Sequence, residues 1–352
     1  MKIGYQTLYL KKRFPLRISR GEMRGGENLF VWLNDGTHTG WGEMAPVASE
    51  GAATAAEGQA QLESFLAQDR ADGLDGSIHD IWARARVAGV GGCALAALDI
   101  ALWDLRAKQA GMPLYRLLGL ARRGVVSSLT VGINPPEVVR ERVPLLLAQG
   151  ARALKIKLGS PEGLEADRAM FAAVHEAAAG SGAVLRVDAN GGWSLDEARA
   201  MMAWLAERGV EYIEQPLVKG AEDQLPYLFK DRALPVFVDE TCQFSTDIPG
   251  FAHCVDGVNL KLMKCGGITE ALRIVATARA HGLKTMIGCM GESSIAIAAG
   301  ASLSALFDYI DLDSHLNLDP DPAEGAPFVD GVTLPADRPG HGGQLKKGHP
   351  HA

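Results

Sequence analysis

The sequence predicts an α/β protein whose parallel strands close into a barrel. Three observations predict this fold: short strand-like segments recur along the chain, amphipathic segments of helical length separate them, and most strand segments end in charged side chains. Such alternation is typical of a parallel sheet, and the carboxyl ends of barrel strands form the active site in proteins of this kind. The eight segments, whose last residues are 22 to 31 positions apart, are Ser128–Gly132, Leu154–Lys157, Leu185–Asp188, Tyr212–Glu214, Phe237–Asp239, Val258–Lys261, Lys284–Ile287 and Ile310–Asp313.

The chain is longer than such a barrel requires. About 120 of its 352 residues precede the first barrel strand, so a second domain is expected. We predict an α+β domain over residues 1–122, the barrel over residues 123–320, and a C-terminal tail over residues 321–352 that returns to pack on the first domain.

The first domain shows strand patterns followed by helix patterns. Alternating segments near Lys2–Leu10, Leu29–Leu33 and Gly40–Glu43 predict three strands, and three helical segments follow them. The last of these, Cys93–Ala110, carries apolar residues on all sides. Since a helix that is apolar all round is normally a buried one, we expect it to lie between the two domains.

Composition excludes several classes of partner. The net charge of −7 is spread without acidic blocks or basic stripes, so we expect neither nucleic acid nor a membrane as a partner. Five scattered cysteines with no C-x-x-C pair predict free thiols in a reducing cytoplasm. The segment Met1–Gln6 lacks the apolar run of a signal peptide, and no stretch reaches membrane-spanning length. A homo-oligomer remains an open alternative to a monomer.

Strand alternation sorts the barrel residues into inward and outward sets. Lys155 and Lys157 share one face of their strand, and Leu154 and Ile156 share the other. Because the outer helices require an apolar face, both lysines are expected to point into the barrel. By the same argument, ten further side chains are expected to point into the barrel: Arg186, Asp188, Tyr212, Glu214, Phe237, Asp239, Asn259, Lys261, Asp311 and Asp313.

Three carboxylates at the ends of consecutive strands predict a metal site. Asp188, Glu214 and Asp239 form an all-oxygen group with no histidine or cysteine beside it. Such hard ligands, with room left for other oxygens, suit Mg²⁺ better than Zn²⁺. The alternative is that these residues are solvated, or paired with Arg186 and the lysines.

Two lysines are predicted to face each other across the barrel mouth. Lys157 and Lys261 lie on the second and sixth of eight strands, with the three carboxylates on the arc between them. Two bases on opposite sides of one carbon suit a racemase or an epimerase. A base must be neutral, and we expect Lys155, Lys264 and a metal ion to lower the lysine pKa by repulsion between like charges. The alternative for a single inward lysine is a salt bridge.

Five linked motifs resemble the successive signatures of the enolase superfamily, in its muconate-lactonizing branch. They are Leu154–Gly159, Arg186–Asn190, Tyr212–Pro216, Val238–Glu240 and Asn259–Gly267, and Gly40–Glu43 and Ala97–Asp104 resemble the capping domain of that family. The resemblance covers nearly the whole chain. It implies an α+β capping domain over a modified TIM barrel, (β/α)₇β, Mg²⁺ on the three carboxylates, and proton abstraction next to a metal-bound substrate carboxylate.

The last strand distinguishes one group within that branch. Asp311-Leu-Asp313 is similar to the Asp-x-Asp of the dipeptide epimerases, typified by L-Ala-D/L-Glu epimerase, in which this pair holds the free ammonium of the dipeptide. The alternative is that Asp311 and Asp313 form salt bridges or cap a turn. The same resemblance implies that Thr130 and Cys289 line the substrate site, although Cys289 is equally well explained as a buried apolar cysteine.

Capping-domain loops choose the substrate side chains in this family. The candidates here, Ser19–Gly26 and Val47–Gly51, contain Arg20, Glu22, Arg24 and Glu50, charges of both signs that leave the preferred dipeptide open. We also expect Gly291 to leave space in the substrate site.

The predicted function is a Mg²⁺-dependent dipeptide epimerase that inverts the α-carbon of the C-terminal residue. Lys157 and Lys261 exchange the proton, and Lys155 helps to bind the carboxylate. The alternatives are an N-acylamino acid racemase, a muconate-type cycloisomerase and, from another class, a non-catalytic barrel used as a binding module.

Overall fold

Eight parallel strands form the barrel, which confirms the predicted fold class. The structure, a computed structural model, describes residues 1–68, 74 and 76–348. Neighbouring strands follow one another in space from β4 to β11, and the ring closes where Ser127 forms a parallel bridge with Ile310. The strands are β4 (Leu129–Val131), β5 (Ala153–Lys157), β6 (Val184–Asp188), β7 (Val210–Glu214), β8 (Val236–Val238), β9 (Gly257–Lys261), β10 (Lys284–Gly288) and β11 (Tyr309–Ile310).

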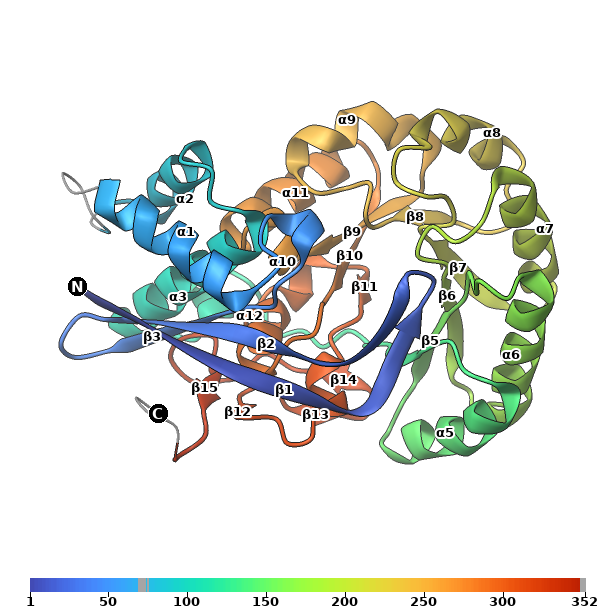
Figure 1. Cartoon of the computed structure of the whole chain (residues 1–352), viewed down its shortest axis with the longest axis horizontal. Coiled ribbons are helices and arrows are strands. Elements are labelled where there is room, and N and C mark those ends of the chain that lie inside the picture. Colours follow the sequence, from blue (N-terminus) through green and yellow to red (C-terminus); the bar gives the residue numbers. More distant parts are fainter. Residues whose placement is uncertain (69–73, 75, 349–352) are drawn as a thin grey trace.

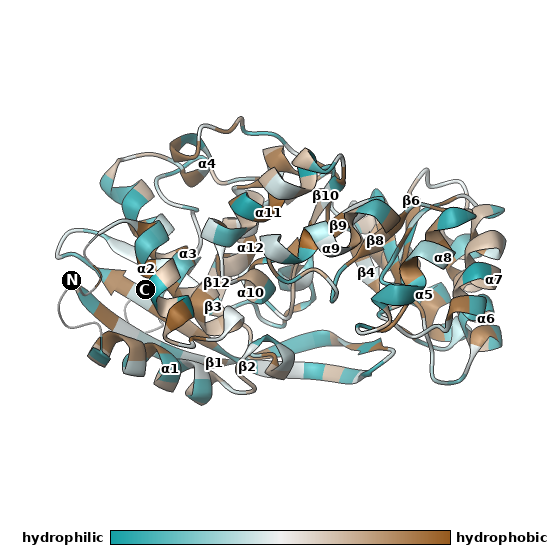
Figure 2. Cartoon of the chain, turned by 90° about the horizontal axis from the view of Figure 1, so that it is seen from above, coloured by the Kyte–Doolittle hydropathy of each residue, from teal (hydrophilic) through white to brown (hydrophobic). Residues whose placement is uncertain are grey.

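Helices follow the first seven barrel strands and lie outside the sheet (Figure 1). After β11 the described chain enters a 3₁₀ turn over Ser314–Asn317 instead of an α-helix, so the arrangement is the (β/α)₇β that the resemblance implies. Figure 2 shows apolar and polar residues mixed along these helices, as expected of helices with one buried face. They are α5 (Pro136–Ala148), α6 (Leu164–Ala177), α7 (Leu195–Ala206), α8 (Leu225–Lys230), α9 (Ile248–Phe251), α10 (Leu262–Cys265), α11 (Ile268–Ala280) and α12 (Ser294–Ala301).

The inward and outward sets are as predicted. Leu154 and Ile156 are fully buried in the apolar core shared with the outer helices. Inside the barrel, Tyr212 and Phe237 pack against each other with ring centroids 4.9 Å apart, and Tyr309 packs edge-on against both. This aromatic floor fills the amino-terminal half of the barrel, so polar chemistry is confined to the other end.

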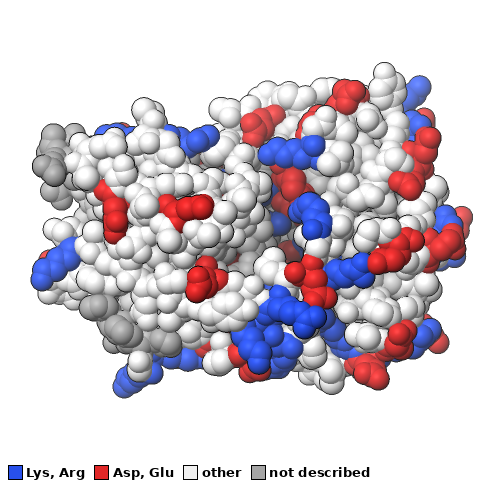
Figure 3. Space-filling view, in the orientation of Figure 1, with Lys and Arg blue, Asp and Glu red and all other residues white. Residues whose placement is uncertain are grey.

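The surface carries no continuous stripe of one sign on the face seen in Figure 3, where acidic and basic side chains are intermixed. Among the described residues, no helix is both long enough and apolar enough to cross a membrane.

An antiparallel sheet in the order β1-β2-β3 opens the chain, and helices pack against it. The three predicted strands are present, but the prediction for the first two was too short, because β1 and β2 continue as one long hairpin that reaches over the barrel (Figure 1). Only Ser19 and Arg20 form its turn, so most of the loop predicted over Ser19–Gly26 is strand. The elements are β1 (Lys2–Ile18), β2 (Gly21–Asn34), β3 (Thr39–Met44), α1 (Ala55–Gln68), α2 (Ile78–Val87), α3 (Gly92–Gln109) and α4 (Leu114–Leu117).

Helix α3 is buried between the antiparallel sheet and the barrel, as predicted. Two glycines of β3 let the helix approach closely: a Cβ at Gly42 would lie 1.9 Å from the Ala97 carbonyl oxygen, and one at Gly40 would lie 2.3 Å from that of Ala101. At its other side a Cβ at Gly92 would lie 2.4 Å from the Lys264 carbonyl oxygen. A larger residue at Gly40 or Gly42 would push α3 away from the antiparallel sheet, and one at Gly92 would push α3 away from the barrel.

The C-terminal tail contacts the first 122 residues. The Leu114 amide donates to the Gly340 carbonyl at 2.7 Å, and the His341 amide donates to Asp104 Oδ1 at 2.8 Å. The boundaries at residues 122 and 320 stay predictions, and residues 349–352 lie outside the described residues. The tail strands are β12 (Ala323–Glu324), β13 (Phe328–Val329), β14 (Val332–Thr333) and β15 (Gln344–Leu345).

Glu43 of β3 ties the antiparallel sheet to the start of α12. Its carboxylate is fully buried and accepts hydrogen bonds from the Ser293 hydroxyl at 2.6 Å and amide at 2.8 Å, from the Ala296 amide at 3.1 Å, and from Asn28 Nδ2 at 2.7 Å. Burial raises the pKa of Glu43, and the hydrogen bonds from Ser293 and Asn28 oppose that rise. One side chain therefore holds the loop that precedes α12.

We predict that Glu43→Ala lowers the free energy of unfolding by about 2–4 kcal/mol, because several buried donors lose their acceptor. The exposed Glu27 on β2 provides the matched control, since Glu27→Ala should change stability by less than about 0.5 kcal/mol. Urea unfolding measures both. If the two substitutions lowered the free energy of unfolding equally, Glu43 would not stabilise the contact between the antiparallel sheet and α12.

Candidate active site

Three buried carboxylates meet at the carboxyl ends of neighbouring strands. Asp188 ends β6, Glu214 ends β7 and Asp239 follows β8. All three are fully buried, and one oxygen of each lies within 4.8 Å of the others. The sequence prediction brought these residues together correctly, because each occupies the inward position at the end of its strand.

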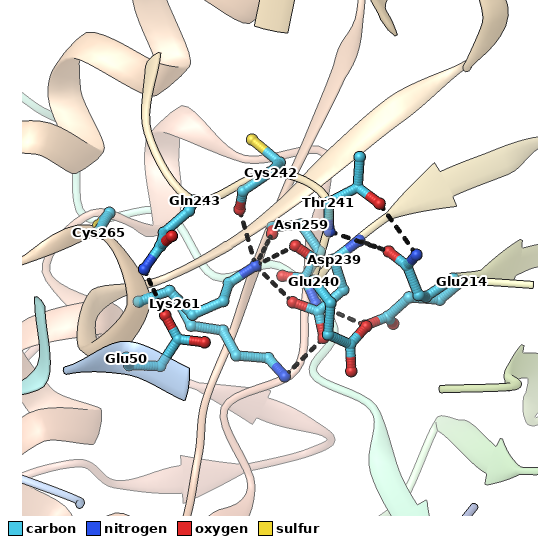
Figure 4. Close-up of polar contacts among 12 residues, drawn as sticks. Glu50, Glu214, Asp239, Glu240, Thr241, Cys242, Gln243, Asn259, Lys261 and Cys265 are labelled. Carbon is cyan, nitrogen blue, oxygen red and sulfur yellow. Dashed lines mark hydrogen bonds and ion pairs between the residues drawn. The ribbon is translucent and has the colours of Figure 1, made fainter. Parts of the chain in front are cut away.

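Lysines surround the three carboxylates. Lys157 Nζ lies 2.5 Å from Asp188 Oδ2, and Lys261 Nζ lies 2.7 Å from Asp239 Oδ2. The contact between Lys261 and Asp239 is visible in Figure 4. Lys155 Nζ lies 3.2 Å from Glu214 and 3.7 Å from Asp188. The two predicted bases, Lys157 and Lys261, therefore flank the carboxylate cluster, and each contacts a different carboxylate.

Arg186 is not part of this cluster, although it points inward as predicted. Its Nε donates to Glu211 at 2.8 Å and its Nη1 to the Ser128 hydroxyl at 2.9 Å, and its guanidinium lies over Tyr212 and Tyr309 of the aromatic floor. The alternative that the carboxylates pair with Arg186 and the lysines is therefore wrong for Arg186, whereas the pairing with lysines is present.

A fourth buried lysine beside the cluster, Lys264, supports Asp239. Its ammonium donates to Asp239 Oδ1 at 2.5 Å, to the Cys242 carbonyl at 3.0 Å and to the Asn259 carbonyl at 2.9 Å. Because its hydrogen bonds are directed at Asp239 and at backbone carbonyls, it acts on the carboxylate and not on Lys261. The sequence analysis placed Lys264 near Lys261 without assigning it this position.

The pKa values show which charges dominate. Burial and the neighbouring Asp188 carboxylate together raise the pKa of Glu214 to about 8. Burial lowers the pKa of Lys261, but the Asp239 carboxylate reverses this effect and leaves it above its ordinary value. Lys155 does lower the pKa of Lys261, as expected, but the Asp239 carboxylate outweighs it, so the net direction is the opposite of the one predicted.

The donor set fits a hard divalent cation. The cluster contains three carboxylates and no histidine or cysteine, which suits Mg²⁺ or Ca²⁺ better than Zn²⁺. Full burial makes three adjacent negative charges costly unless cations neutralise them. Asp188, Glu214 and Asp239 would hold the ion.

Two polar residues that the sequence analysis did not assign support this cluster, one at the Asp188 carboxylate and one at the Asp239 backbone. The Asn190 amide donates to Asp188 Oδ1 at 2.8 Å, and the Asp239 amide donates to Gln215 Oε1 at 2.8 Å. Both Asn190 and Gln215 have positive φ, 44° and 37°. The sequence offered one sign of this role. Asn190 and Gln215 come one or two residues after a strand-end carboxylate, where the chain turns away from the barrel.

A cavity beside the cluster brings the predicted substrate residues together. Thr130, Lys155, Cys289, Asp311 and Asp313 all line it, and so does Lys157. Residues that the sequence analysis missed also line it: Lys12, Leu16, Met290, Ser314 and Asn317. Lys12 and Leu16 come from the long hairpin, whose approach to the barrel no local pattern reveals.

Contacts inside this cavity give each predicted residue a defined environment. Lys155 forms an ion pair with Asp311, so the salt-bridge alternative for Asp311 holds in this structure. Asp313 Oδ2 accepts from the Thr130 amide at 2.6 Å. Burial and the adjacent Asp311 together raise the pKa of Asp313 to about 6. Burial also raises the pKa of the Cys289 thiol, so this residue lines the cavity as a neutral group.

A second, larger cleft of about 430 Å³ lies between the hairpin turn and the barrel loops, and Arg20, Glu50, Asn190 and Glu240 line it. Arg20 donates to the Asn190 carbonyl at 2.8 Å and to Glu240 at 2.6 Å. Glu50 accepts from Gln243 Nε2 at 2.7 Å, as Figure 4 shows. Of the loop charges that left the specificity open, Arg20 is therefore paired with a carboxylate and Glu50 is hydrogen-bonded to a neutral amide.

The other two charged loop residues pair with each other. Arg24 Nε lies 2.9 Å from Glu22 Oε1, and both side chains are exposed. Neither residue lines the cleft.

Two protein families match the chain. The family "Enolase C-terminal domain-like" matches residues 138–348, and the family "Mandelate racemase / muconate lactonizing enzyme, N-terminal domain" matches residues 5–119. A protein of Roseobacter litoralis named hydrophobic dipeptide epimerase is 77% identical over 98% of this chain and 99% of its own length. A protein of the same name from Flavobacteria bacterium (strain MS024-2A) is 58% identical over 99% of each chain.

Solved structures agree with these matches. A dipeptide epimerase from Enterococcus faecalis V583, complexed with Mg and the dipeptide L-Leu-L-Tyr, has a TM-score of 0.89 and 31% identity over 97% of this chain and 98% of its own. A substrate-liganded L-Ala-D/L-Glu epimerase from Bacillus subtilis has a TM-score of 0.90 and 27% identity over 97% and 98%.

We predict that Mg²⁺ raises the melting temperature of the metal-free protein, because an ion that binds only the folded state stabilises it. Asp239→Asn should abolish most of this shift, whereas Glu211→Gln, at the opposite end of the barrel, should keep it. Thermal unfolding after EDTA treatment and Mg²⁺ readdition measures the effect. A full shift in Asp239→Asn would show that the ion binds elsewhere.

Proposed function

Because this chain belongs to the enolase superfamily, we propose that it is a Mg²⁺-dependent dipeptide epimerase that inverts the α-carbon of the C-terminal residue. The membership confirms the resemblance that the strand motifs indicate. Its relatives named hydrophobic dipeptide epimerase, and the solved dipeptide epimerases that hold Mg and a dipeptide, support this activity and this cofactor for the chain.

One observation carries the proposal: two lysines flank the carboxylate cluster from different strands. Lys157 contacts Asp188 and Lys261 contacts Asp239, and both lysines are largely buried, with 6% of each residue exposed. A substrate carbon held between them presents one face to each ammonium or amine. Such an arrangement suits removal of a proton by one lysine and its return by the other.

The carboxylate cluster positions the reacting end of the dipeptide. Asp188, Glu214 and Asp239 would hold Mg²⁺, which would supply positive charge beside the substrate carboxylate, where negative charge develops when the α-proton leaves. Lys155, which lies against Glu214 and Asp188, adds a fixed cation at the same place. Lys157 and Lys261 act in opposite forms in each turnover, one as the neutral base and the other as the ammonium acid.

Asp311 and Asp313 bind the other end of the dipeptide in this proposal. Both carboxylates line the cavity that Lys157 also lines, and Asp311 Oδ1 is a buried acceptor without a hydrogen-bond partner among the described residues. The free ammonium of a dipeptide is a donor of the right charge for this pair. An N-acylated amino acid lacks that charge, which disfavours the N-acylamino acid racemase and the cycloisomerase alternatives.

The larger cleft favours an uncharged side chain on the C-terminal residue. Arg20 is paired with Glu240, and Glu50 is bonded to Gln243, so neither offers a free charge to a substrate. Lys219 also lines this cleft, so only an acidic side chain would find a charge of opposite sign there, whereas an apolar side chain loses no favourable hydration on entering. This agrees with the hydrophobic dipeptides named for the closely similar relatives.

The enzyme is proposed to work in the cytoplasm. All five cysteines are free thiols, and thiols persist in a reducing compartment. This assignment extends the sequence prediction and depends on the cysteines alone.

We predict that Lys157→Ala and Lys261→Ala each lower the rate of epimerisation by at least about 100-fold, because each removes one of the two proton-transfer groups. Each variant should still exchange the α-proton of one epimer with solvent deuterium, since one base remains. The exposed Lys284 at the other end of β10 is the control, and Lys284→Ala should keep near wild-type activity. Undiminished epimerisation in either variant would overturn the two-base proposal.

The ammonium clamp gives a separate prediction. Acetylating the amino terminus of the dipeptide should lower kcat/KM at least about tenfold, because a charge-assisted hydrogen bond is lost. Asp313→Asn should shrink this discrimination. A wild type that prefers N-acylated amino acids would instead establish the racemase alternative.

The same clamp should depend on pH. Burial and Asp311 raise the pKa of Asp313 to about 6. The carboxylate is therefore negatively charged above pH 6, and it loses this charge by protonation as the pH falls through 6. The ratio of kcat/KM for the free dipeptide to that for its acetylated form should therefore decrease below about pH 6.

A further inference from the structure

Lys12 is a buried cation that the proposed reaction does not use. It lies on β1, in the part of the hairpin that extends over the barrel, and only 6% of the residue is exposed. Its side chain lines the same cavity as Asp311 and Asp313. A capping-domain lysine therefore reaches the end of the substrate site that is proposed to bind the dipeptide ammonium.

The ammonium of Lys12 has no partner in the described part of the chain. No carboxylate there lies within 4.0 Å of its Nζ, and its side chain makes no hydrogen bond there. Burying an unpaired ammonium costs free energy that a structure normally avoids. Such an unpartnered group, directed at a cavity, is expected to interact with whatever enters it.

Lys12 Nζ lies next to the loop between β10 and α12, which contains Gly291. A Cβ added at Gly291 would lie 3.9 Å from Lys12 Nζ and 3.8 Å from Met23 Sδ. The space that the sequence analysis expected at Gly291 is therefore bordered by the hairpin, with the Lys12 ammonium as one of its walls. Asn28 Nδ2 holds this loop by donating to the Gly291 carbonyl at 2.8 Å.

Neighbouring acidic groups compensate Lys12 only in part. Burial raises the pKa of Glu292 to about 8, so this carboxyl is largely neutral at pH 7. Burial likewise keeps the Cys289 thiol protonated. Of the acidic groups that act on Lys12, Asp313 is the one ionised at that pH, and Arg142 adds a second positive charge. The cavity wall therefore presents net positive charge beside the proposed ammonium clamp.

We propose that Lys12 determines specificity at the first residue of the dipeptide by excluding lysine and arginine there. The inference rests on the proposed function, because the clamp on Asp311 and Asp313 places the first α-carbon, and hence the start of its side chain, in the cavity that Lys12 lines. A cationic side chain would meet the buried ammonium in a medium of low dielectric, where like charges repel strongly. An apolar side chain meets no such repulsion and packs against Leu16 and Met290.

The test compares two dipeptides that differ by one charge. Both end in L-valine, and the first residue is either L-lysine or L-2-aminoheptanoic acid, in which a methyl group replaces the ammonium. The wild type should favour the neutral dipeptide at least about tenfold in kcat/KM. Lys12→Met should reduce this preference at least about tenfold, whereas Lys12→Arg, which keeps the charge, should retain it.

A position control separates a local effect from a general one. The same two residues are placed second, after L-alanine, and Lys12→Met should leave that ratio unchanged. An equal change at both positions, or an unchanged ratio at the first position, would overturn the inference. A wild type that accepts both first residues equally would overturn it even if Lys12→Met fails to fold.

Failure of the inference and failure of the proposed function are distinguishable. If the wild type epimerises neither these dipeptides nor any other, the proposed function is wrong. If it epimerises the neutral dipeptide and Lys12 does not affect the choice of first residue, the function stands and the role of Lys12 is wrong.

Discussion

Mutual neutralisation of buried charges is the constraint on which the rest of the structure depends. Asp188, Glu214 and Asp239 are fully buried, and carboxylates are rarely tolerated inside a protein unless cations neutralise them. Lys157, Lys261 and their neighbours supply that charge through contacts of 2.5–3.2 Å. The barrel makes these contacts possible, because its apolar floor and outer helices fix the strands whose ends carry the charges.

The antiparallel domain completes the site by supplying its walls. Its β1–β2 hairpin places Arg20 against Glu240 and Lys12 in the substrate cavity, while Glu43 and Asn28 hold the loop that carries Cys289. The barrel therefore contributes the groups proposed for the chemistry, and the hairpin contributes groups proposed to choose the substrate.

The sequence was sufficient for the barrel and its cluster because strand alternation and strand-end charge are local signals. Asp188, Glu214, Asp239, Lys157 and Lys261 each occupy an inward position that a period of two residues identifies. Lys12 gave no such signal, because it sits among the charged residues Lys11 and Arg13 and approaches the cavity only through the path of the hairpin. The direction of the Lys261 pKa was missed for a related reason: the contact with Asp239 depends on distance across strands, which spacing along one strand does not give.

The most direct measurement of the central claim is the incubation of the wild-type enzyme with Mg²⁺ and an apolar dipeptide in D₂O, followed by mass spectrometry and NMR. Two opposed lysines acting on one α-carbon should introduce a single deuterium at the α-carbon of the C-terminal residue as that centre inverts, and none at the first residue. Inversion without deuterium, deuterium at the first residue, or no exchange in the presence of Mg²⁺ would contradict the account.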